Sequence, residues 1–183
     1  MTKNLVISLV IVALAVSCRK NDLDPDLSQP ILFEYEFINN AWGYQHLGWM
    51  IDAHNRVRGY FRPDIWNHPD ENGLLSKAEL LENLDQSDTT YFKVNSYYLN
   101  KYFDDRFEIQ GAPVDTSDLY MADAGMGVLY VYVWDSSEEK YSRVLLASRG
   151  DIMMTNSHSK TEKVVKWLET VGKQTDRFYW FDN

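Results

Sequence analysis

Alternating hydrophobic and polar residues predict β-structure at the start of the folded part. In residues 31–37 the aromatic side chains fall on one side and Glu34 and Glu36 on the other, which is the pattern of a half-buried strand. Two further strand-like runs, 47–52 and 56–61, are separated by three residues that suit a hairpin loop. We therefore expect one strand followed by a β-hairpin.

Helical signals follow this hairpin. In Ser76-Lys-Ala-Glu79, serine and glutamate have the spacing of a capping box, in which each side chain bonds a backbone amide of the first turn. Apolar residues on one stripe then predict a helix over about 77–84. Residues 89–104 fit helical spacing but are rich in aromatics, as strands are; we favour a second helix there.

The second half of the chain repeats both patterns. Residues 127–134 and 141–148 are rich in β-branched and aromatic residues and predict another hairpin. Ser159-Lys-Thr-Glu162 is a second capping-box pattern, before an apolar face that predicts a helix ending near Gly172. The aromatic run at 178–181 is predicted to be an edge strand.

Strands and helices do not alternate strictly, which argues against a parallel sheet. We therefore predict a single α+β domain over residues 31–183. Its antiparallel sheet would contain hairpins near 47–61 and 127–148, packed by two to three helices.

The N-terminus has the three parts of a secretory signal peptide. Lys3 precedes an apolar run at 5–16, and Ser17 precedes Cys18, the only cysteine. The run is shorter than the roughly 20 residues that span a bilayer, which argues against a retained membrane helix. A buried core helix is the other alternative, and the charged start and polar continuation argue against it.

Leu14-Ala-Val-Ser-Cys18 resembles the lipobox of bacterial lipoproteins. The resemblance implies cleavage after residue 17 and attachment of fatty acyl chains such as palmitate to Cys18. Residues 1–17 would then be the signal peptide, and the polar, proline-containing residues 18–30 a flexible tether. The implied location is the cell envelope of a Gram-negative bacterium, at the outer membrane or cell surface, since Arg19 replaces the aspartate that commonly signals inner-membrane retention.

Most of the folded region is also similar to uncharacterised lipoproteins of Bacteroidota. The segment after Lys20 also resembles the acidic surface-export signals of that group. The resemblance implies a location and no particular activity. It is carried by four segments: Trp42-Gly-Tyr, Gly48-Trp-Met-Ile-Asp52, Met121-Ala-Asp-Ala-Gly125 and Val165-Lys-Trp-Leu168.

Charge narrows the possible partners. The chain has 27 acidic and 18 basic residues, a formal net charge of −9. Because nucleic-acid binding needs a basic patch, we expect no nucleic-acid partner. The membrane partner would be reached through the lipid instead.

The segment 68–79 resembles the twelve-residue calcium loop of an EF-hand. Oxygen-bearing side chains fall at ligand positions, with Gly73 at the turn. His68 stands where an aspartate is usual, and Pro63 interrupts the helix that should enter the loop. The alternative is a glycine turn leading into the capping box. The calcium candidates are Asp70, Asn72, Ser76 and Glu79.

The remaining motifs do not indicate a particular catalytic or binding function. The histidines are not at metal-ligand spacing, and we expect surface or turn positions for all four: His46, His54, His68 and His158. Arg149-Gly-Asp151 matches the tripeptide that integrins recognise, but three residues often recur by chance, and we favour a simple turn after a strand. The chain has no nucleophile motif and no cysteine left for catalysis.

Aromatic residues make up 14% of the chain, so we expect some of them at the surface. The candidate ligand-binding residues are those in or near turns: Trp42, Tyr44, Trp49 and Trp66. The preferred function is a non-catalytic module that binds a glycan, peptide or protein. The alternatives are an envelope hydrolase that uses a carboxylate pair, and a calcium-stabilised module. The competing explanation for the four candidate aromatic residues is that they are buried in the core and bind no ligand.

Overall fold

The computed structural model describes residues 29–41, 43–117 and 123–180. The proposed signal peptide, Cys18, most of the tether and Trp42 lie outside the described residues. The rest forms a single α+β domain built on one antiparallel sheet of nine strands. This confirms the predicted fold class.

The sheet has the order β5-β3-β2-β1-β7-β8-β9-β6, and β4 pairs with β8. Both predicted hairpins are present, as β2 with β3 and as β7 with β8. The strands are β1 (Ile31–Asn39), β2 (Gln45–Asp52), β3 (Arg56–Phe61), β4 (Leu74–Leu75), β5 (Thr89–Lys93), β6 (Val114–Thr116), β7 (Met126–Asp135), β8 (Lys140–Gly150) and β9 (Met154–Asn156).

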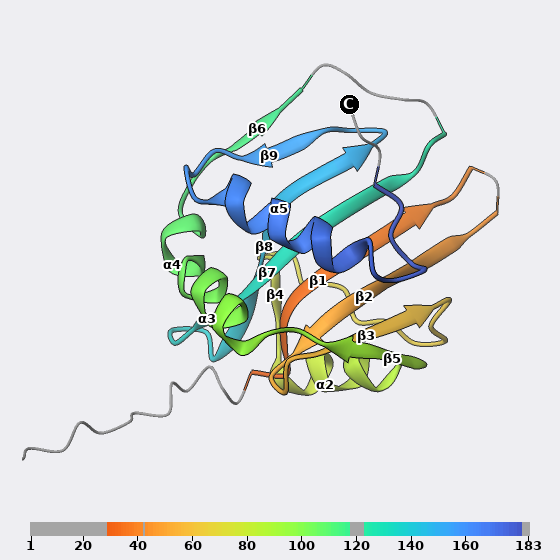
Figure 1. Cartoon of the computed structure of the whole chain (residues 1–183), viewed down its shortest axis with the longest axis horizontal. Helices are drawn as coiled ribbons and strands as arrows, with labels where there is room; N and C mark the ends of the chain where they lie inside the picture. Colours follow the sequence, from red (N-terminus) through yellow and green to blue (C-terminus); the bar gives the residue numbers. More distant parts are fainter. Residues whose placement is uncertain (1–28, 42, 118–122, 181–183) are drawn as a thin grey trace, which may run out of the picture.

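One face of the sheet is covered by α3 (Ser96–Asp104), α4 (Arg106–Ile109) and α5 (Thr161–Gly172), with α5 lying across the strands (Figure 1). The core on this face is mainly aliphatic and aromatic. Its central strand, β1, contributes Phe33, Tyr35 and Phe37, as the alternation predicted.

The other face is also covered, which corrects the prediction of a half-buried first strand. The chain from β4 into α2 (Lys77–Asp85) packs on it, with Leu80 and Leu84 in a second hydrophobic cluster. As a result Glu34 and Glu36 are only 0% and 4% exposed. Periodicity identified the two faces of β1 correctly, but a distant segment decided that both are buried.

The single helix predicted over 89–104 is wrong. Its first part is β5, which pairs with β3 at the edge of the sheet. Helix α3 begins after Asn95, whose side chain accepts a hydrogen bond from the Tyr97 amide. Pairing with an open sheet edge thus prevailed over helical spacing.

The predicted edge strand at the C-terminus is also wrong for the described residues up to Trp180, which form no strand. Phe178 packs against Tyr35 instead, with ring centroids 4.8 Å apart. The Tyr35 hydroxyl donates to the Tyr179 carbonyl at 2.5 Å and accepts from the Tyr179 amide. The aromatic run therefore closes the core.

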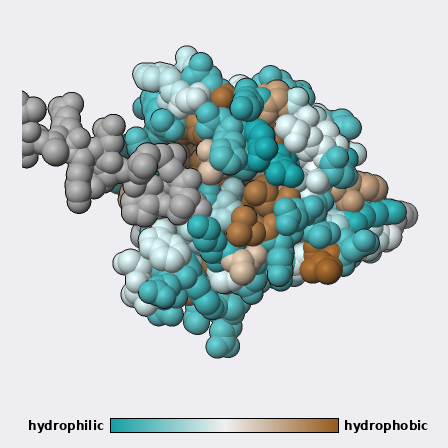
Figure 2. Space-filling model, turned by 90° about the horizontal axis from the view of Figure 1, so that it is seen from below, coloured by the Kyte–Doolittle hydropathy of each residue, from teal (hydrophilic) through white to brown (hydrophobic). Residues whose placement is uncertain are grey.

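Viewed from below, the surface is mostly hydrophilic, with smaller hydrophobic patches (Figure 2).

Candidate functional site

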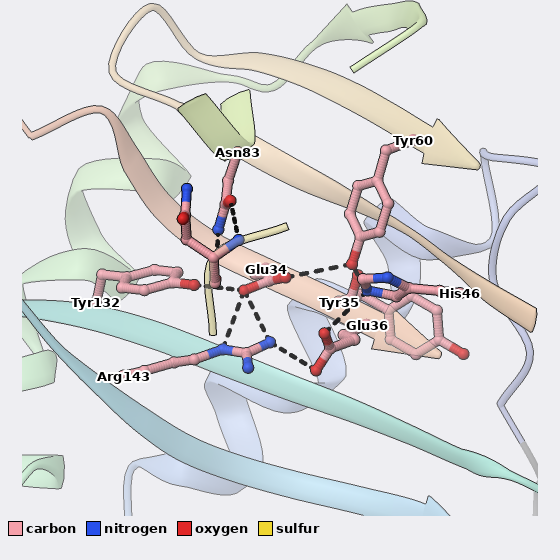
Figure 3. A network of polar contacts seen from close by, with 9 residues as sticks. Glu34, Tyr35, Glu36, His46, Tyr60, Asn83, Tyr132 and Arg143 are labelled. Atoms are coloured by element: carbon pink, nitrogen blue, oxygen red, sulfur yellow. Dashed lines mark hydrogen bonds and ion pairs between the residues drawn. The ribbon is translucent and has the colours of Figure 1, made fainter. Parts of the chain in front are cut away.

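A cluster of polar side chains is buried between the sheet and α2, and we call it the buried polar cluster (Figure 3). Its members come from five strands, of which β7 and β8 are far from the other three in sequence. They are Glu34 and Glu36 of β1, His46 of β2, Tyr60 of β3, Tyr132 of β7 and Arg143 of β8.

Arg143 joins the two carboxylates of the buried polar cluster. Its Nε donates to Glu34 Oε2 at 3.1 Å, and its Nη2 donates to Glu36 Oε2 at 2.7 Å. The guanidinium also lies 3.7 Å from the centroid of the Tyr130 ring. One cation thus partly compensates two buried acids, which matters because an unpaired buried charge is costly.

The remaining carboxylate oxygens are bonded as well. Glu34 accepts from the Tyr132 hydroxyl at 2.5 Å and from the Tyr60 hydroxyl at 3.2 Å. Glu36 Oε1 lies 3.0 Å from His46 Nε2. His46 is 1% exposed, so the predicted surface or turn position was wrong for this histidine. It is buried because α2 and the segment before it cover this end of the sheet.

The two carboxyl groups differ in their acidity. Burial raises the pKa of Glu34, and this effect outweighs the attraction of Arg143. Burial acts in the same direction on Glu36, but there Arg143 and the His46 hydrogen bond prevail and lower the pKa to about 2. Burial also raises the pKa of Tyr60 and Tyr132, so both hydroxyls keep their protons.

Gly48 makes room for this arrangement. A Cβ atom there would lie 2.0 Å from the Tyr35 carbonyl oxygen and 2.7 Å from the Tyr60 hydroxyl oxygen. Only glycine therefore lets the Tyr60 ring cross β2 and reach Glu34.

We interpret the buried polar cluster as structural. All four carboxylate oxygens already accept hydrogen bonds inside the protein, and both glutamates are buried. A general acid, base or nucleophile has to reach its substrate. The hypothesis of a hydrolase that uses a carboxylate pair gains no support from this pair.

The predicted aromatic surface is divided by the fold. Trp66 packs against Tyr60 with ring centroids 4.3 Å apart and planes tilted by 33°, and it lies edge-on to His46. Tyr44 is 54% exposed and lies near the same histidine. Trp49 is fully buried on the opposite face, where it stacks on Tyr35 and cannot meet a ligand at the surface.

The EF-hand-like residues have partners within the protein. Asp70 Oδ1 accepts from two backbone amides, and its Oδ2 lies 2.7 Å from Lys140 Nζ. Ser76 and Glu79 form the predicted capping box, which is confirmed at 3.2 and 2.7 Å. No cluster of three metal-binding side chains is found among the described residues. Calcium binding stays a prediction.

The Arg149-Gly-Asp151 segment ends β8 in a tight turn. Gly150 has a φ of +125°, and a Cβ there would lie 2.0 Å from the Gly125 carbonyl oxygen. Asp151 accepts from the Ala124 amide at 2.8 Å. The glycine is thus explained by backbone packing alone.

A groove open to solvent lies between α3 and α5, with a volume of about 510 Å³. We call it the aromatic groove. Small-molecule sites have volumes of this size. It is lined by Tyr98 and Tyr102 of α3 and by Lys163, Lys166, Trp167 and Thr170 of α5.

Stacked rings form the base of the aromatic groove. Tyr102 and Trp167 lie with centroids 5.0 Å apart and planes at 25°. Trp167 also makes an edge contact with Phe33 in the core, at 5.5 Å. Tyr98 extends the aromatic surface outward and is 47% exposed.

Sequence reasoning missed the aromatic groove, although part of the signal was present. Its α5 residues recur at spacings of three, one and three, so they form one helical stripe, and its two α3 tyrosines are four apart. Each stripe is visible in the sequence. That the two stripes meet on one face of the sheet is not visible in the sequence, because it depends on how the helices pack.

The fold and the aromatic groove define an α+β domain with an open aromatic site between two helices. No protein-family model, curated protein or solved structure matches this chain. The similarity to Bacteroidota lipoproteins therefore stays a prediction. Within the described residues, no helix has the length and apolar character needed to cross a membrane.

Proposed function

We propose that this chain is a lipid-anchored envelope protein whose folded domain is a non-catalytic binding module. Its ligand site is the aromatic groove between α3 and α5. The observation that carries the proposal is an open aromatic groove in which Tyr98 is exposed and the half-buried Tyr102 and Trp167 are held by packing against the core. Large rigid aromatic side chains bury much area on binding at a small entropic cost.

The N-terminal pattern supports the anchor. Cys18 ends an apolar run that begins after Lys3, and two or more acyl chains on it would hold a protein stably at a membrane. The outer membrane or cell surface of a Gram-negative bacterium is the proposed location. Gln29 is buried and donates to the carbonyls of Ile31 and Tyr132, so the fold holds the chain from this residue onward. The chain from Cys18 to Gln29 could extend at most about 40 Å.

The lining of the aromatic groove supports binding rather than catalysis. It has no carboxylate, histidine or cysteine. These are the side chains that most often act as general acids, bases or nucleophiles. The ammonium groups of Lys163 and Lys166 and the hydroxyl of Thr170 can form hydrogen bonds with a ligand.

Array binding tests the proposal. The mature protein in detergent micelles, applied to glycan and peptide arrays, is expected to give specific signals that Tyr98→Ala reduces about tenfold or more. Tyr44→Ala is the matched control, because Tyr44 is 54% exposed and does not line the groove. Binding that both variants leave unchanged would contradict the proposed site.

A further inference from the structure

The aromatic groove is basic in a protein that is acidic overall. Lys163 and Lys166 are the charged residues of its lining, whereas the chain as a whole carries a net charge of −9. The two acids of α5 each have a partner, and the partner of Glu162 is a lysine of the groove itself. Glu162 pairs with Lys166 at 2.5 Å, and Glu169 accepts from the Trp180 indole N–H at 2.9 Å. Local charge of this sign favours an anionic ligand.

Lys166 can exchange its present partner for a ligand. The ion pair of Lys166 with Glu162 is exposed on both sides, at 69% and 74%, and such pairs add little stability. Lys163 is exposed as well. On the α3 side, Lys101 Nζ lies 5.5 Å from the centroid of the Tyr102 ring. Three ammonium groups thus border the aromatic rings.

The rings suit a cyclic ligand with an apolar face. Tyr102 and Trp167 are stacked and supported by Phe33, so little ordering is needed on binding. The C–H face of a pyranose ring packs well on such a surface. The Thr170 hydroxyl donates to the Trp167 carbonyl at 2.6 Å, which leaves its oxygen able to accept from a sugar hydroxyl.

We infer that the aromatic groove binds a glycan that contains uronic acids. The sugar rings lie against the aromatic side chains, and the carboxylates face Lys163 and Lys166. This inference rests on the proposed function and names its ligand class. An acidic peptide supplies the charge but lacks the rigid apolar ring face, and a neutral glycan supplies the ring but no negative charge to attract the exposed lysines.

Calorimetric titration of the mature protein in detergent micelles tests the inference. The ligands are oligomers of galacturonate, glucuronate and mannuronate, each compared with its own methyl ester, which keeps the rings and removes the charge. We expect at least one acid to bind about tenfold more tightly than its ester, and the preference to shrink as salt is raised. Lys163→Gln and Lys166→Gln are each expected to weaken binding of the acid about fivefold and to leave the ester unchanged.

Lys77→Gln is the matched control, because this exposed lysine lies on α2 at the opposite face of the sheet. Equal binding of every acid and its ester would overturn the inference and leave the proposed function standing. Equally tight binding of hexaglutamate, or of glycerophosphoglycerol, the soluble headgroup of phosphatidylglycerol, would overturn it in favour of a peptide or a membrane. Glycan binding that Tyr98→Ala does not weaken would instead refute the proposed site.

Discussion

Arg143 shows how one residue can determine the environment of several others. It is a cation beside two acids, and its side chain is 7% exposed. Without it, Glu34 and Glu36 would be two buried carboxylates next to each other, an arrangement that costs several kcal/mol. The alternation in β1 revealed that both glutamates share a face, but nothing near them in sequence pointed to their partner.

The acidity of Glu36 leads to a prediction about stability and pH. The folded protein releases this proton near pH 2, whereas an unperturbed glutamate does so near 4.5. Between these values the unfolded chain binds more protons, so the stabilisation from Glu36 is present above pH 4.5 and is lost as the pH falls towards 2. Glu36→Gln is expected to lower the free energy of unfolding by about 3 kcal/mol at pH 7. At pH 3 this loss should fall to about half or less.

Urea unfolding at both pH values measures this difference. Glu71→Gln, at an exposed turn, is the matched control and should change little at either pH. Glu34 has the opposite shift, a raised pKa, so its ionisation lowers the stability of the fold, and Glu34→Gln should cost less at pH 7 than Glu36→Gln. An equal cost of Glu36→Gln at pH 7 and pH 3 would contradict this account of the buried polar cluster.

At the scale of elements, local patterns were reliable where nothing distant competed with them. The hairpins and helix α2 were predicted because alternation, turns and a capping box depend on neighbouring residues. The segment 89–104 was mispredicted because the open edge of β3 recruits its first part as β5. The two similar serine motifs also had different outcomes. Ser76 caps α2, whereas α5 begins after Lys160 without a side-chain cap.

These two motifs give a direct comparison. Ser76→Ala is expected to lower the free energy of unfolding by about 1 kcal/mol, because the Glu79 amide loses its acceptor. Ser159→Ala is the matched control from the motif that forms no cap, and it should change stability by less than about 0.5 kcal/mol. Urea denaturation of both variants at pH 7 measures the difference. A larger loss from Ser159→Ala would contradict the observed helix start.

At the scale of the whole molecule, the proposed protein consists of a lipid anchor, a tether and a folded domain. The anchor rests on the sequence pattern that ends at Cys18, and the ligand site rests on the meeting of α3 and α5. The two parts are independent, so each needs its own test.

Mass spectrometry of the protein from membranes of its native host tests the anchor. We expect a chain that begins at Cys18, with acyl chains on the sulfur and residues 1–17 removed. Cys18→Ser should shift most of the protein out of the acylated membrane pool. Asn21→Ser is the control within the tether and should remain acylated. An intact first segment with an unmodified sulfur would refute the anchor.

The sequence by itself determined the strands of both hairpins, helix α2, the α+β class and the acidic charge, because these depend on local periodicity and composition. Tertiary structure alone decided that Glu34 and Glu36 are buried and that two helical stripes meet in the aromatic groove. Glu34 and its partner Arg143 are 109 residues apart in the chain. The physical reason is that periodicity shows which side of an element a residue occupies, whereas burial depends on what distant segment packs against that side.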